Sequence, residues 1–167
     1  MKKRLVCLFF LVSILLLFNS IEAKVINCGN DYDCFLNASV NCEKSKVVVN
    51  DSIDLFFVRF DLDTQMQIKG MKKDSCILSV KNKKVDFVLN ETILNEFSFG
   101  LMTHKEFVEL QRRARSQAKQ YKDFSGSCKL SNEELTGLLN TWNLGFFDPI
   151  IDYKELGCRG RFFSDEI

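Results

Sequence analysis

The residues of this chain that could carry covalent or redox chemistry are its cysteines, and their spacing favours structural disulfides. The chain has seven cysteines. Three of them, Cys28, Cys34 and Cys42, lie close together, whereas Cys76, Cys128 and Cys158 are widely spread. A nucleophilic or redox cysteine needs an accessible thiolate, and the sequence contains no Cys-x-x-Cys. Once Cys7 is removed with the N-terminal segment described below, an even set remains, which predicts disulfides in an oxidising compartment.

Helical geometry restricts the pairing of these cysteines only in part. If residues 31–41 form a helix, Cys34 and Cys42 lie about 12 Å apart along its axis. A disulfide needs Cα atoms within about 7 Å, so these two cysteines do not pair. We favour a Cys128–Cys158 bridge around the C-terminal helices and a Cys42–Cys76 bridge from the first helix to the sheet, among the fifteen arrangements that six cysteines allow.

No other set of residues has the spacing of a catalytic or metal site. The single histidine, His104, is expected at the start of a surface helix, and one histidine excludes a His-rich metal centre. Paired carboxylates could serve a glycosidase if they lay about 5–9.5 Å apart across a sugar cleft. Three such pairs occur, Asp31/Asp33, Asp61/Asp63 and Asp148/Asp152. The simpler interpretation of each pair is a helix cap or a turn. The sequence therefore predicts no catalytic residue, no cofactor-binding residue and no metal ligand.

Two kinds of surface site are predicted instead. Three N-glycosylation sequons begin at Asn37, Asn50 and Asn90. A long helix after residue 103 also has a basic face that could meet an anionic partner such as lipid head groups or an acidic glycan, formed by Arg112, Arg115, Lys119 and Lys122. The alternative is that this face is only solvated, with Glu106 and Glu109 pairing with Arg112 and Arg113 at helical spacing.

Phenylalanine is unusually common, at sixteen residues against one tryptophan. Several phenylalanines fall in predicted loops or in the C-terminal tail: Phe97, Phe99, Phe146, Phe147, Phe162 and Phe163. Burial in the core is the simpler interpretation, and an exposed recognition patch is the alternative.

The first 23 residues have the pattern of an export signal. Lys2, Lys3 and Arg4 precede an apolar run of about fourteen residues, which is shorter than the ~20 needed to span a bilayer as a helix. Cleavage after Ala23 is expected, which leaves residues 24–167 as a single exported domain with no membrane span. Removing three basic residues and Glu22 changes 23 basic and 22 acidic residues to 20 and 21. This balance predicts no nucleic-acid partner.

Hydrophobic periodicity predicts a short helix followed by a sheet. Residues 31–41 are helical because Phe35, Ala38 and Cys42 share one helical face. The period then changes to two, which indicates an antiparallel meander of four to five strands, in which Cys76 points into the core. The strand-like runs are residues 47–49, 53–60, 65–69, 76–80 and 85–89.

The remainder of the chain is predicted to be helical after an irregular stretch at residues 90–102. Two capping boxes, Thr103–Glu106 and Ser131–Glu134, open a helix of about five turns and a second helix that ends near Trp142. A third, short helix is expected from Asp148-Pro149 to Gly157. The predicted fold class is α+β: a short N-terminal helix, the meander, then two to three C-terminal helices, with disulfides adding stability.

With these elements in order, the chain resembles a loose group of small exported, disulfide-containing proteins, mostly prokaryotic, whose function is not characterised. The similarity covers roughly residues 28–80. It rests on Cys28-Gly29, Cys34-Phe35, Ala38 and Cys42, and then on a strand hairpin that carries Ile68-Lys-Gly70 and Cys76. The resemblance implies a secreted α+β domain without an assigned activity, so it supplies no functional residues.

These features favour a non-enzymatic exported domain, at the cell surface or outside the cell, that binds a protein or glycan partner and needs no cofactor. Two other classes are compatible with the sequence. A secreted inhibitor or toxin-like effector would be recognised by a rigid exposed loop near residues 97–102 flanked by disulfides. A small carboxylate-dependent hydrolase would need a deep cleft with two converging carboxylates.

Overall fold

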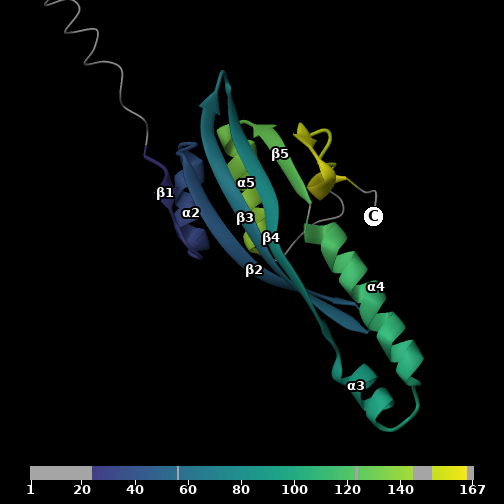
Figure 1. Cartoon of the computed structure of the whole chain (residues 1–167). Coiled ribbons are helices and arrows are strands. Elements are labelled where there is room, and N and C mark those ends of the chain that lie inside the picture. The colour runs from purple at the N-terminus through teal and green to yellow at the C-terminus, as the bar shows by residue number, and fades with distance from the viewer. Residues whose placement is uncertain (1–23, 56, 123, 145–151, 165–167) are drawn as a thin grey trace, which may run out of the picture.

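The structure is a computed structural model that describes residues 24–55, 57–122, 124–144 and 152–164. Three long antiparallel strands form its centre. The strands are β2 (Ser45–Leu55), β3 (Val58–Lys72) and β4 (Ser75–Leu89) (Figure 1). In β3 every second residue from Val58 to Gly70 is buried. This alternation belongs to a strand with one face on a core and one face in solvent.

Shorter strands extend the sheet on both sides. On one side β1 (Ile26–Asn27) runs parallel to β2. On the other side β5 (Ser125–Leu130) pairs antiparallel with β4, and β6 (Cys158–Arg159) pairs with β5. Within the described residues the sheet is therefore mixed, with six strands in the order β1-β2-β3-β4-β5-β6.

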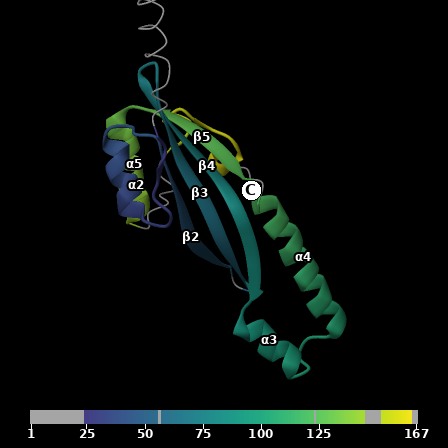
Figure 2. The same ribbon diagram turned by 60° about the vertical axis from the view of Figure 1, so that its left-hand side comes forward.

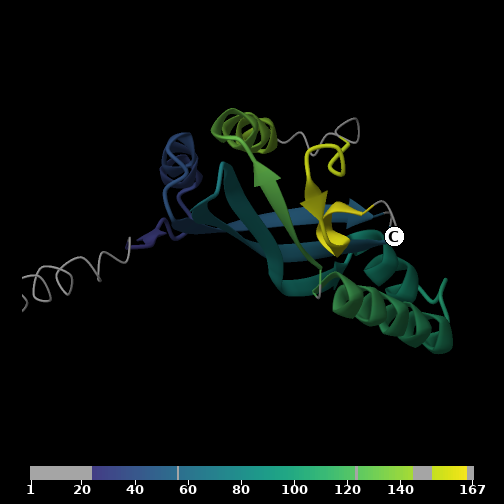
Figure 3. The same cartoon turned by 90° about the horizontal axis from the view of Figure 1, so that it is seen from above.

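The longer helices all pack against the same alternating set of β3 side chains. At one end of the sheet α2 (Tyr32–Val40) and α5 (Asn132–Asn143) lie side by side (Figure 2). They pack over Met66 and Ile68 of β3. At the other end α4 (His104–Lys122) covers Phe60 and Leu62. All three helices contact the same face of the sheet. Because the sheet twists strongly along its length, α4 points away from α2 and α5 when the molecule is seen from above (Figure 3).

The core accordingly has two clusters. The first lies between the sheet and α2 and α5, and its buried members include Phe35, Ile68, Leu78, Leu135 and Leu139. The second lies beneath α4 and is centred on Phe60, with Val85, Ile93, Ala114 and Ala118 around it. Ile93 belongs to α3 (Glu91–Ser98), a helix at the far end of the molecule.

Side-chain caps begin the helices where the sequence predicts them. Asp31 Oδ1 accepts a hydrogen bond from the Cys34 N–H at the start of α2. The capping boxes Thr103–Glu106 and Ser131–Glu134 are both formed, which confirms the predicted starts of α4 and α5. Each box satisfies backbone N–H groups that a helix leaves unpaired in its first turn.

All six cysteines after residue 23 are paired, as Cys28–Cys34, Cys42–Cys76 and Cys128–Cys158. The second and third pairs are the two that the sequence favours. Every bridged cysteine except Cys34 is buried, and Cys76 lies in the core as predicted. All three bridges belong to the first cluster or pack against it, so the second cluster has no covalent crosslink.

Several predicted strand boundaries are wrong. The run 53–60 contains a hairpin turn between Leu55 and Val58 instead of a single strand. The runs 76–80 and 85–89 belong to one strand, β4, because Asn82 to Lys84 form a bulge opposite Asp63 and Thr64 and not a turn. The expected chain order is also incomplete, because β5 lies between α4 and α5. The sheet has six strands in the described part of the chain, and four to five were predicted.

Two helical predictions also need correction. Residues 90–102 are not irregular throughout, because α3 occupies Glu91–Ser98, with the Asn90 side chain accepting from the Ile93 N–H. The predicted third helix begins at residues that lie outside the described part. From Asp152 to Gly157 the chain forms turns, and the helical segment that follows is a short 3-10 helix, η1 (Arg161–Phe163). The predicted export signal, residues 1–23, likewise lies outside the described residues.

A buried polar residue, Asn82, fastens α4 to the sheet. The Thr64 hydroxyl donates to Asn82 Oδ1 at 2.9 Å, and Asn82 Nδ2 donates to the Tyr121 carbonyl at 2.9 Å. The Asn82 backbone N–H donates to the Phe124 carbonyl at 3.0 Å. The bulge in β4 therefore places one side chain where it can hold the end of α4.

Replacing Asn82 with alanine is expected to lower the free energy of unfolding by about 1–3 kcal/mol, because it leaves the buried Thr64 hydroxyl and Tyr121 carbonyl without these partners. Urea denaturation followed by circular dichroism measures the change. Asn143→Ala, at an exposed position at the end of α5, is the matched control and should stay within about 0.5 kcal/mol of the wild type. An equally small effect of Asn82→Ala would show that this network does not hold α4.

Candidate functional site

The β2–β3 hairpin, α3 and the start of α4 meet at one end of the molecule (Figure 1). Large apolar side chains of these segments and of the loop between the two helices are exposed to solvent. Phe99 and Leu101 are each 78% exposed, and Phe57 is 53% exposed. Leu94 on α3 and Val108 on α4 are also exposed. We call this end of the molecule the apolar tip, and its large exposed apolar residues are Phe57, Leu94, Phe99, Leu101 and Val108. Single exposed apolar residues are common on proteins, whereas large apolar residues exposed close together, as Phe99 and Leu101 are in one loop, are typical of interaction sites.

The loop that carries Phe99 and Leu101 is held by its own backbone. The N–H groups of Leu101 and Met102 both donate to the Glu96 carbonyl, at 2.9 and 3.3 Å. Gly100 ends the turn with φ +72°, a conformation that side chains with a Cβ rarely adopt. Met102 is thereby turned inwards against the second cluster, while Phe99 and Leu101 point to solvent.

Aromatic stacking beneath the loop fixes α3 against α4. The rings of Phe97 and Phe107 are stacked, with centroids 4.2 Å apart. Ile93, one turn earlier on α3, is buried in the second cluster. The exposed loop is thus supported by packed side chains on both sides.

An open groove of about 600 Å³ lies next to the tip residues. Its floor is apolar and includes Ile93, Met102 and Leu110, and the exposed Phe57 also lines the groove. Its rim is polar and comprises Glu96, Thr103, Lys105, Glu106, Glu109 and Arg113. A groove of this size, with an apolar floor and a polar rim, is the usual form of a site for a small ligand or a few side chains of a partner.

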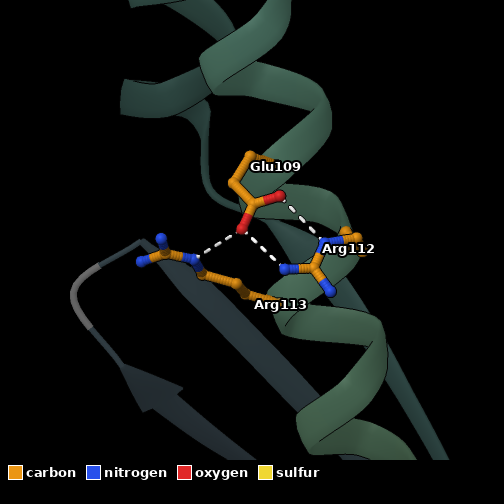
Figure 4. Close-up of polar contacts among 3 residues, drawn as sticks. All are labelled: Glu109, Arg112 and Arg113. Atoms are coloured by element: carbon orange, nitrogen blue, oxygen red, sulfur yellow. Dashed lines mark hydrogen bonds and ion pairs between the residues drawn. The ribbon is translucent and has the colours of Figure 1, made fainter.

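The charged residues of the rim are largely satisfied within the protein. Glu109 accepts hydrogen bonds from Arg112 at 2.7 and 2.8 Å and from Arg113 at 3.1 Å (Figure 4). The guanidinium of Arg112, and then that of Arg113, lowers the pKa of the Glu109 carboxyl to about 2. The Thr103 hydroxyl and backbone N–H lower the pKa of Glu106 below its usual value. These carboxylates are therefore ionised at neutral pH and committed to local contacts, so they are poor general bases.

The predicted basic face of α4 is only partly free. Arg112 is bound to Glu109, as the solvated-face alternative requires. Arg115, Lys119 and Lys122 are exposed and form no ion pair with the described residues. This face remains a possible site for an anionic partner, with three available cations instead of four.

The other candidate residues do not converge on a catalytic centre within the described part of the chain. His104 is exposed, with its ring 6.2 Å from that of Phe97. Asp31 caps α2, Asp61 pairs with Arg59, and Asp63 accepts from Asn50. Asp148 lies outside the described residues. Among the described residues, no group of three or more His, Cys, Asp or Glu side chains could hold a metal ion.

The three sequon asparagines lie in different settings. Asn37 is exposed on α2, and Asn50 is exposed on β2, where its Nδ2 donates to Asp63 at 2.6 Å. Asn90 is half-buried and caps α3. Their glycosylation stays a prediction.

Some phenylalanines of the predicted loops are buried in the core, and one is exposed, so both interpretations of these residues apply in part. Phe163 is buried, where its ring packs over Gly126, and Phe97 and Phe162 are half-buried. Phe99 instead belongs to the exposed tip. Phe146 and Phe147 lie outside the described residues. The sequence signal for the tip is the segment Phe99-Gly-Leu101, in which a glycine separates two large apolar residues between helices.

No helix in the described residues is both long enough and apolar enough to cross a membrane. Comparison of the chain with protein-family models, with curated proteins and with solved structures finds no match in any of the three.

Proposed function

We propose that this protein is an exported, disulfide-stabilised binding module, without catalytic activity of its own, that holds an apolar segment of a protein partner at its tip. The observation that carries the proposal is the rigid, exposed pair Phe99 and Leu101 beside an apolar groove. The disulfides support the part of the proposal that concerns an extracytoplasmic location.

The energetics of the tip favour binding. Full burial of a phenylalanine or leucine side chain contributes about 1.5–3 kcal/mol. Because the loop is already ordered by the hydrogen bonds to the Glu96 carbonyl, little conformational entropy is lost when a partner covers it. A few aromatic and aliphatic residues at the centre of an interface commonly supply most of its affinity.

The alternative functions receive less support from the described residues. An inhibitory loop was expected to be flanked by disulfides, but the three bridges lie in the other half of the molecule. A carboxylate-dependent hydrolase needs two converging carboxylates in a cleft. The carboxylates that line the groove near the tip, Glu106 and Glu109, are instead bound to Thr103 and to two arginines.

The proposal predicts that Phe99→Ser/Leu101→Ser abolishes partner capture without unfolding the protein. A photo-crosslinking amino acid in place of Leu94, at the edge of the tip, should give a discrete protein adduct when the full chain is expressed in its own cells. The double variant should reduce that adduct at least tenfold, because it removes the apolar contact.

The matched control is Val25→Ser/Val40→Ser, which changes two exposed apolar residues far from the tip. It should leave the adduct unchanged, and urea denaturation should show both double variants within about 0.5 kcal/mol of the wild type. The proposal is wrong if no adduct forms, or if the tip variant and the control reduce it equally.

A further inference from the structure

The face of the sheet opposite α2 and α5 is open and polar. Cross-strand pairing places Lys46, Gln67, Ser79, Ser127 and Arg159 in one row across five strands. Their neighbours along the strands, such as Ile68, Leu78 and Cys128, are buried on the other face. The row is therefore exposed or half-buried on the side that the helices leave uncovered.

Charge is segregated along this open face. We call the half opposite α2 and α5 the basic sheet face. Its five cations are Lys46, Lys69, Lys81, Lys129 and Arg159. The uncharged polar residues among them are Gln65, Gln67, Ser79 and Ser127. No acidic residue of the described strands lies on this half of the face.

The half nearer the tip has the opposite character. It carries Asp54, Asp61, Asp63 and Asp86, and there Arg59 pairs with Asp61 and Lys84 pairs with Asp86. On the basic sheet face, by contrast, none of the five cations forms an ion pair with a described residue. Unpaired like charges repel, so their grouping costs stability unless a ligand brings the opposite charge.

We propose that the basic sheet face binds a linear anionic polysaccharide. Lys and Arg side chains bind carboxylate or sulfate groups, and the glutamine and serine side chains between them can donate to and accept from sugar hydroxyls. From Lys46 to Arg159 the row crosses four inter-strand spacings, about 19 Å, which accommodates several sugar rings.

The composition of this face disfavours the other anionic polymers. Single-stranded nucleic acid binds by stacking bases on aromatic rings, and no aromatic residue of the described strands lies on the basic sheet face. Peripheral binding to a lipid surface combines basic residues with exposed apolar side chains that insert. The aliphatic residues here, Val48 and Ile77, are half-buried in the sheet and do not project as such an apolar surface.

The test measures binding of the full chain after residue 23 to dextran sulfate and to polygalacturonate, with neutral dextran for comparison. We expect binding to at least one of the two charged polymers at low salt, and none to dextran. Lys81→Glu/Lys129→Glu should weaken that binding at least tenfold, and the difference should shrink at high salt because ions screen the attraction. Urea denaturation checks that the variant keeps its fold.

The matched control is Arg115→Glu/Lys119→Glu, which changes the net charge by the same amount on α4 and leaves the sheet untouched. It should change the affinity no more than threefold. Phe99→Ser/Leu101→Ser should also bind the polymer normally, so failure of this proposal and failure of the tip proposal are distinguishable.

The proposal is wrong if the protein binds neither charged polymer. It is also wrong if both charge-reversal variants weaken binding equally, which would show attraction by net charge only, or if the α4 variant alone weakens binding, which would place the site on α4. Tighter binding to single-stranded DNA or to anionic phospholipid vesicles than to either polysaccharide would overturn it as well.

Discussion

Replacing Cys42 and Cys76 together with alanine is expected to lower the free energy of unfolding by about 4 kcal/mol, because this bridge joins residues 34 positions apart. Crosslinking a long segment restricts the unfolded chain and so raises its free energy. Both cysteines are buried, so the substitution also removes side chains from the first cluster. Urea denaturation of the oxidised protein measures the loss.

The control for this prediction is Cys28→Ala/Cys34→Ala, which opens a bridge over only six positions. The same relation gives a loss of about 2 kcal/mol for it. An equal effect of the two double variants would contradict the chain-restriction argument. Denatured, unreduced wild-type protein should at the same time give no thiol reaction from the cysteines after residue 23, because all six are paired.

Phe60→Ala is expected to lower the free energy of unfolding by about 3–5 kcal/mol, the range for removing a large aromatic side chain from a core. Phe60 is 1% exposed and its ring centroid lies 5.6 Å from that of Tyr121 on α4. Because the second cluster has no disulfide, we expect the damage to be concentrated there. Hydrogen exchange should show faster amide exchange in α4 and in the nearer half of β3 and β4.

Amides of α2, α5 and β5 should stay protected in this variant, since they surround the first cluster and its three bridges. Phe99→Ala removes an equally large side chain from an exposed position, and it should change stability by no more than about 0.5 kcal/mol. Uniform loss of protection across the whole sheet by Phe60→Ala would contradict the separation into two clusters.

Local patterns predicted α2, α4, α5 and the buried face of the sheet, because capping and periodicity act within a few residues, but they missed α3. The starts of α2, α4 and α5 follow from Asp31 and the two capping boxes. The strand β5 could not be found in this way. Its sequence, Ser125-Gly-Ser-Cys-Lys-Leu130, has little intrinsic strand preference. It is a strand because β4 offers backbone partners to it, which is a long-range effect.

The positions of two turns could not be predicted from the usual turn residues. The β2–β3 hairpin reverses within an apolar run that contains no glycine or asparagine, so the run 53–60 resembles one strand. In β4 the segment Lys81-Asn-Lys-Lys84 has the polar character of a turn, yet Asn82 is buried and bonded to Thr64 and Tyr121. Tertiary contacts override local preference at both positions.

The candidate surfaces were predicted only in part. The basic face of α4 follows from helical periodicity, and the structure adds that Arg112 pairs with Glu109 while Arg115, Lys119 and Lys122 form no ion pair with a described residue. The apolar tip depends on which way the α3–α4 loop turns. The basic sheet face depends on the register of five strands, which brings Lys46 and Arg159 into one row from opposite ends of the chain. Neither arrangement is visible in a linear pattern.

The three disulfides have a consequence for how the chain matures. Each joins a cysteine to the next one along the chain, so no covalent loop encloses or overlaps another. If the chain is exported as we propose, a thiol oxidase that links cysteines in their order of emergence during translocation would produce the native set directly. Disulfide exchange, which proceeds through mixed-disulfide intermediates, would not be needed to correct earlier bonds. The chain should reach its oxidised form as fast as a simple oxidant can act, independently of any isomerase.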